Sequence, residues 1–166
     1  MAIVASARMI ISLLGATSPA SPRFGELSRT LENGSGGARW THGQASGMID
    51  HVYQVDGTLA AAATDSYNTL AAGSLTDLLG GAIDLDELKA FVLVCNTGSI
   101  KFVAPAANFL SLFVAATDGI NLTAGQAIGL DLAAAGLAVG ANGKFDITDT
   151  FGGAGSTYSL MFVGSN

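Results

Sequence analysis

The feature of this sequence that most restricts its fold is a series of short apolar stretches separated by glycine-containing turns. The clearest stretch runs from Leu88 to Asn96, and its continuous apolar part, residues 90–95, is typical of a strand covered on both faces. Residues 144–149 instead alternate between apolar and polar side chains, which is the period of a half-buried strand. Both patterns predict β-structure.

The remaining apolar stretches extend this prediction along the chain. Further strands are expected at residues 48–55, 66–70, 76–79, 100–103, 112–115, 126–131 and 156–163. Asp56-Gly57 is expected to end the first of them as a turn. Short strands at close intervals, with a plausible helix only at residues 2–14, predict an all-β fold. We therefore expect an antiparallel β-sandwich or jelly-roll-like domain over residues 48–166.

Residues 1–47 are expected to form an extended N-terminal arm. Residues 15–47 are rich in glycine, serine and proline and show little apolar periodicity. The arm is either a disordered leader or a segment that becomes ordered against a neighbouring subunit. Arg8 is the only positive side chain in the apolar start, which therefore lacks the basic region of a signal peptide. Glycines and prolines interrupt the stretch after Arg8, and no membrane anchor is expected.

Charge and composition narrow the possible partners. The net charge of −6 argues against a nucleic-acid-binding protein, which needs a basic surface. Only 12% of the residues are charged and 49% are hydrophobic, so much of the surface is expected to be apolar. Such a surface favours assembly into a symmetric oligomer or a larger particle.

The sequence shows no catalytic, metal-binding or cofactor-binding signature. A phosphate-binding loop and a nucleophile elbow are both absent from it. His42 and His51 are nine residues apart, with no spacing that indicates a metal site or an acid–base pair. Cys95 ends an apolar strand and is expected to be a buried, inert thiol. Asp146 and Asp149 are expected on opposite faces of one strand, where they cannot form a carboxylate pair. We therefore expect a protein that is not an enzyme.

Several segments resemble small virion structural proteins of tailed bacteriophages. The similarity lies in residues 50–65, 70–80, 85–98 and 146–164, where turns rich in small residues lead into apolar strands. The resemblance implies a virion protein that is made in the bacterial cytoplasm and built into the particle. The leading expectation is a capsid decoration, or cement, protein on the capsid surface, which binds the major capsid protein where shell subunits meet and forms a homotrimer.

The expected partner-binding residues lie in the arm. Arg23, Arg29, Arg39 and Trp40 are the candidate anchors, because residues 1–40 carry a net charge of +2 whereas the rest of the chain carries −8. The alternative is a tail- or fibre-associated module that binds the host through a glycan or a receptor. The resemblance supplies no catalytic, metal-binding or cofactor-binding residue.

Overall fold

The structure is a computed structural model that describes residues 41–42, 48–73, 75–77, 80–132 and 136–166. All of these belong to one compact unit, Trp40–Asn166. Apart from a single 3-10 turn, η1 (Ala71–Gly73), the regular structure of these residues consists of strands. The expected all-β fold is therefore confirmed. No helix in the described part of the chain is long and apolar enough to cross a membrane.

The strands vary in length from two residues to eleven. They are β1 (Thr41–His42), β2 (Met48–Ile49), β3 (His51–Leu59), β4 (Thr64–Asn68), β5 (Glu87–Thr97), β6 (Ser99–Val103), β7 (Gly119–Thr123), β8 (Ala127–Asp131), β9 (Leu137–Ala138), β10 (Lys144–Asp149) and β11 (Ser156–Ser165). β1 and β2 form a small parallel pair, and every other pairing of named strands is antiparallel.

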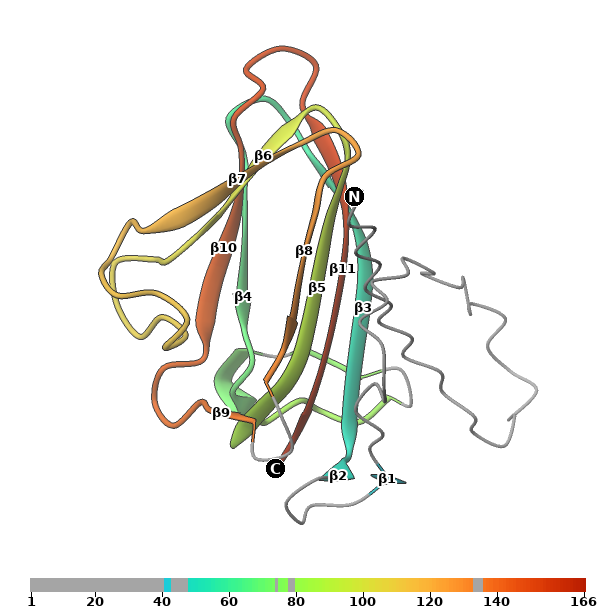
Figure 1. The fold of residues 1–166 in the computed structure, drawn as a ribbon, viewed down its shortest axis with the longest axis vertical. Helices are drawn as coiled ribbons and strands as arrows, with labels where there is room; N and C mark the ends of the chain where they lie inside the picture. Colours follow the sequence, from blue (N-terminus) through green and yellow to red (C-terminus); the bar gives the residue numbers. More distant parts are fainter. Residues whose placement is uncertain (1–40, 43–47, 74, 78–79, 133–135) are drawn as a thin grey trace, which may run out of the picture. The chain divides into compact units, whose positions relative to one another are not determined.

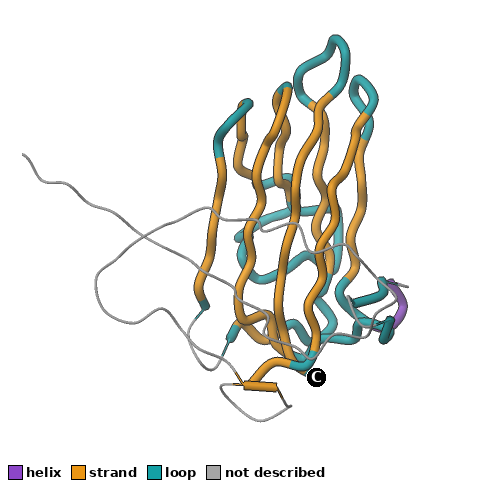
Figure 2. Tube along the Cα trace, turned by 90° about the vertical axis from the view of Figure 1, so that its right-hand side faces the viewer, coloured by secondary structure: helices purple, strands orange, loops and turns teal. Residues whose placement is uncertain are grey.

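A five-stranded sheet and a four-stranded sheet form the body of the unit (Figure 1). The first has the order β3-β11-β5-β8, with β9 also pairing with β5, and the second has the order β4-β10-β6-β7. Strands that follow each other in the chain occupy matching places in the two sheets. The matching pairs, in order across the sheets, are β3 and β4, β11 and β10, β5 and β6, and β8 and β7. This connectivity is that of a jelly roll. The expected β-sandwich is therefore confirmed, and most of its strands run side by side (Figure 2).

The hydrophobic core lies between the two sheets, and Phe145 of β10 is near its centre. Its ring centroid lies 5.1 Å from that of Tyr67, 5.6 Å from that of Phe91 and 5.5 Å from that of Phe102. These aromatic side chains come from β4, β5 and β6, so the packing of Phe145 joins both sheets. Phe145 points into the core because residues 144–149 alternate as predicted, which turns Phe145 and Ile147 inward.

The prediction that Asp56-Gly57 forms a turn is wrong. β3 continues through both residues to Leu59, and Gly57 lies opposite Tyr158 of β11. The Tyr158 ring occupies the space that a Cβ atom at Gly57 would need. The glycine is therefore used for a close aromatic contact within the sheet, a role that short-range turn rules do not anticipate.

Two further sequence predictions need correction. Residues 112–115 form no strand but lie in the long connection between β6 and β7. β7 itself was not predicted, because Leu122 is its only buried residue and the segment shows no clear alternation. In the stretch 76–79, Thr76 makes only an isolated bridge to Ala82, and residues 78–79 lie outside the described ranges.

The other strand predictions are confirmed to within a few residues. The continuous apolar run at residues 90–95 lies in β5, where both alternating sets of side chains are largely buried. The prediction for residues 144–149 matches the bounds of β10. The helix expected at residues 2–14 and most of the expected arm lie outside the described residues.

Candidate functional site

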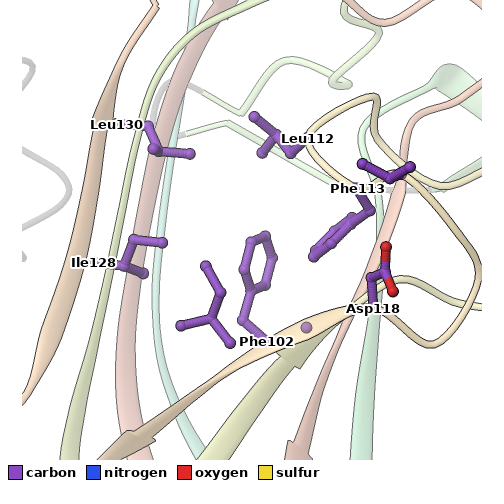
Figure 3. Close-up of a pocket in the computed structure, with 9 residues that line it drawn as sticks. Phe102, Leu112, Phe113, Asp118, Ile128 and Leu130 are labelled. Carbon is purple, nitrogen blue, oxygen red and sulfur yellow. The ribbon is translucent and has the colours of Figure 1, made fainter.

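An apolar pocket opens between the two sheets at their β7 and β8 edge. β7 diverges from β8 there (Figure 1), and the connection between β6 and β7 closes one side. The pocket has a volume of about 280 Å³. Ile128 and Leu130 of β8 line one side and face the side chains of the opposite sheet and the connection (Figure 3). The labelled lining residues are Phe102, Leu112, Phe113, Asp118, Ile128 and Leu130.

The chemistry of this pocket is that of apolar contact. Phe102 and Phe113 pack together with ring centroids 4.9 Å apart. Asp118 is the one charged lining residue, and its Oδ2 accepts a hydrogen bond of 2.8 Å from the Ala115 backbone N–H. That carboxylate therefore holds the shape of its own loop. At the mouth, Val114 is 95% exposed, so the apolar surface continues outward.

The outer face of the first sheet, β3-β11-β5-β8, is a second apolar surface. In β11, Leu160 and Phe162 belong to the core, so the alternate residues Met161 and Val163 point away from it. Val163 lies opposite Val52 of β3 and Ala90 of β5, which continue the same face. We call this surface the outer apolar patch. Its buried residues are Val52, Ala90, Val94, Met161 and Val163.

His51 lies between two carboxylates at the start of β3. Its Nδ1 is 3.1 Å from Oδ2 of Asp77, and its Nε2 is 3.8 Å from Oδ1 of Asp50. Asp77 also accepts a 2.8 Å hydrogen bond from the Gly81 backbone N–H. The contacts connect β3 to the segment that precedes β5. In this arrangement the carboxylates orient the imidazole, and these contacts hold the loop in place.

A hydrogen-bonded chain of two tyrosines and a carboxylate crosses the core. The hydroxyl groups of Tyr67 and Tyr158 are 2.5 Å apart, and the Tyr158 hydroxyl donates to Oδ2 of Asp65 over 2.5 Å. Burial raises the pKa of Tyr67 to about 12, and burial together with the bond to Asp65 raises the pKa of Tyr158 further. Both phenols therefore keep their protons near neutral pH, where they connect β4 to β11.

Asp149 is the buried acceptor at the end of β10. Its carboxylate accepts hydrogen bonds of 2.5 Å from the Ser156 hydroxyl, 2.9 Å from the Ala62 N–H and 3.3 Å from the Gly152 N–H. These bonds, with the Ser156 hydroxyl first, lower the pKa of Asp149 below its usual value. Asp146 points to the opposite face of the strand, as expected, so the two carboxylates form no pair.

Replacing Asp149 by asparagine is expected to destabilise the fold at neutral pH and to weaken its acid sensitivity. A lowered pKa in the folded state means that the carboxylate contributes stability above about pH 4, its unfolded value. That contribution is lost as the pH falls through the folded-state pKa. Thermal unfolding between pH 7 and pH 2 measures the effect. Asp146→Asn on the outward face is the control, and an unchanged acid dependence in Asp149→Asn would contradict the assignment.

The described residues hold no cluster of three or more histidine, cysteine, aspartate or glutamate side chains that could bind a metal ion. Cys95 is buried as expected, and burial raises the pKa of its thiol. A raised thiol pKa is typical of a structural cysteine, because the thiolate is the reactive form.

The four predicted anchors, Arg23, Arg29, Arg39 and Trp40, lie outside the described residues. The sequence did not reveal the pocket. Its connection residues 112–114 were assigned to a strand because they are apolar. No local signal could have found it, because an apolar run such as residues 112–114 is equally compatible with a strand and with a loop.

Comparison with known proteins adds no assignment to this geometry. No protein-family model matches the sequence, and no curated protein matches it either. What is established is the class of fold: a jelly-roll β-sandwich with an apolar pocket at one edge and an apolar outer face on one sheet.

Proposed function

We propose that this chain is a non-enzymatic structural protein of a tailed-bacteriophage virion, and that it decorates the capsid. In this role it binds the major capsid protein where shell subunits meet and stabilises the assembled shell. The sequence resemblance to small virion proteins supports the proposal. The jelly roll supports it by analogy, because viral capsid proteins are among the proteins that use this fold.

The observation that carries the proposal is that the polar groups described above form hydrogen bonds within the fold, whereas the pocket is lined mainly by apolar side chains. Asp149 connects β10 to the loop before β4 and to β11, and the Tyr67–Tyr158 pair connects β4 to β11. Those groups hold strands together inside the fold. The pocket and its mouth, by contrast, offer apolar contact. This distribution suits a protein that binds other protein surfaces.

Shell binding stabilises a particle by mass action. A protein that binds only the assembled shell lowers the free energy of that state by RT ln(1 + [L]/Kd). In the proposed complex the arm carries the anchors Arg23, Arg29, Arg39 and Trp40. Its net charge of +2 favours an acidic partner, and the attraction weakens as the salt concentration rises. Three copies of the chain form the decorating unit.

Substitution of the arm anchors tests this function. In the full chain, Arg23→Ala with Arg29→Ala is expected to weaken binding to expanded, undecorated capsids at least tenfold, and Trp40→Ala is expected to weaken it further. Lys101→Ala with Lys144→Ala removes the same charge from the sandwich and is the matched control, with less than a twofold effect. Co-sedimentation with shells at two salt concentrations measures both. Equal affinity of the two double variants would refute the role of the arm.

A host-binding module of the tail or a fibre is the second candidate, and the pocket is the observation that favours it. Ligand sites are concave and mostly apolar, with few polar groups, and this pocket has that character. Val114 at the mouth is almost fully exposed, so Val114→Asp leaves the core intact. Pull-down with host envelopes and with empty capsids separates the two functions. Envelope binding that Val114→Asp abolishes, without any capsid binding, would favour the second candidate over the first.

A further inference from the structure

Strand β7 lies at the outer edge of its sheet, and its free side is exposed. Its one neighbour in the sheet is β6, and the two strands pair without a register shift from Gly119 to Thr123. Of its five residues only Leu122 is buried. Natural sheets use charged residues, prolines and bulges to keep an edge strand from pairing with another chain. β7 contains none of the three.

Hydrogen bonds at both ends of β7 show which backbone groups point to the free side. The Ala104 N–H donates to the Asp118 carbonyl over 2.8 Å, and the Ala124 N–H donates to the Gly98 carbonyl over 3.0 Å. Hydrogen-bonded pairs alternate along an antiparallel ladder, so the even-numbered residues of β7 bond to β6. The backbone groups of the odd-numbered residues therefore point away from β6.

Two residues on this free side have backbone groups without a partner in the chain. Thr123 is satisfied, because its N–H donates to Oε1 of Gln126 over 2.9 Å and its carbonyl accepts the Gln126 N–H over 2.9 Å. Within the described part of the chain, no hydrogen bond engages the outward groups of Gly119 and Asn121. Both residues are exposed. The edge therefore presents two donors and two acceptors in a row.

We propose that β7 pairs with β7 of a second copy of this chain, antiparallel and about a two-fold axis at Ile120. In this register Gly119 of each copy lies opposite Asn121 of the other, and the outward groups form four hydrogen bonds between the chains. A shift of the axis by one residue in either direction brings in Thr117 or Thr123, whose backbone groups already bond within the chain. The proposed register is therefore the one that uses every free group.

The side chains also fit this register. Ile120 is 44% exposed, lines the pocket and lies on the same face of the strand as the buried Leu122. The axis places it opposite Ile120 of the second copy in a non-hydrogen-bonded pair, where side chains approach most closely. Asp118, just before the strand, lies opposite Leu122 of the second copy, so no carboxylate faces another. The contact thus covers apolar surface at the pocket without bringing like charges together.

A second copy fits this edge better than an unrelated extended peptide, because the free stretch is only three residues long. A longer peptide laid along β7 would leave its own backbone groups opposite Thr117 and Thr123, which already bond within the chain. A second β7 has the same short free stretch, so neither copy is left with unpaired groups. This inference does not depend on the proposed function, since the contact is two-fold and a threefold decorating unit needs a different surface.

Disulfide trapping in the full chain tests the register. Ile120→Cys places two thiols directly opposite each other, with Cα atoms about 4.5 Å apart, which a disulfide can span. Thr123→Cys is the matched control, because this exposed position on the same strand lies about 20 Å from its copy in the proposed register. We expect the covalent dimer to form at least tenfold faster at position 120. The native Cys95 is buried and does not contribute.

Sedimentation of Asn121→Pro tests the hydrogen bonds between the chains. Proline removes the outward N–H of residue 121, which takes no part in the pairing with β6, so the fold is expected to persist. The contact is small, and self-association is therefore expected only near millimolar chain concentration. The unmodified protein and Asn121→Ala are expected to associate equally, and Asn121→Pro is expected to associate at least tenfold more weakly.

Three results would overturn the proposal. They are a chain that stays monomeric at millimolar concentration, self-association that Asn121→Pro leaves unchanged, and a disulfide that forms no faster at position 120 than at position 123. A trimer without trapping at position 120 belongs to the last case and leaves the proposed function intact. The disulfide experiment decides the matter even where the proline variant fails to fold.

Discussion

Replacing Phe145 by alanine is expected to lower the free energy of unfolding by about 3–5 kcal/mol, the largest effect of any single truncation considered. The ring is fully buried and packs against aromatic side chains from three other strands. Its removal leaves a cavity that those rigid neighbours cannot fill, since they belong to both sheets. Chemical denaturation of the purified protein measures the change.

Phe151→Ala is the matched control for this prediction. Phe151 is 56% exposed and lies in the turn between β10 and β11, so its truncation is expected to cost less than about 0.5 kcal/mol. Similar losses in the two variants would mean that Phe145 does not have the central position described for it.

Replacing Gly57 by valine is expected to destabilise the fold by about 3 kcal/mol. A Cβ atom at this position overlaps the Tyr158 ring, so the ring must move. The movement separates the Tyr158 hydroxyl from Asp65 and Tyr67 and leaves buried polar groups without partners. Thermal unfolding measures the loss. Thr58→Val, at the exposed neighbouring position of the same strand, is expected to have little effect.

A double-mutant cycle tests whether the loss of stability comes from the clash with the Tyr158 ring or from a general intolerance of larger side chains in β3. In a Tyr158→Ala background the ring is gone, and Gly57→Val is expected to cost at most about 1 kcal/mol. Additive effects of the two substitutions would show that glycine is required at position 57 for a reason other than contact with Tyr158.

The sequence was sufficient to predict the fold class because strand signals are local. The alternation in residues 144–149 and the apolar run in residues 90–95 each identify a strand from a few neighbouring side chains. The run also predicted that β5 is covered on both faces. Strand order could not be predicted in this way, because the pairing of β11 with β3 depends on residues about a hundred positions apart.

The wrong predictions at Gly57 and at residues 112–115 also arose because local sequence patterns do not reveal contacts between distant segments. Gly57 looked like a turn residue because its partner, Tyr158, is distant in sequence and supplies the reason for the glycine. Residues 112–115 looked like a strand because they are apolar, yet they lie in a loop in which Leu112 and Phe113 are half-buried at the open edge of the sandwich and line its pocket. No local pattern distinguishes an apolar strand from an apolar loop that covers an edge.

The position of β11 has a consequence for how the molecule is made. The strand lies between β3 and β5, and it is the last of the described strands along the chain. While a ribosome is still synthesising residues 156–165, the two neighbouring strands have a gap between them and cannot form their sheet. The nascent chain must wait with its future interior exposed, and folding is completed in one late and slow step.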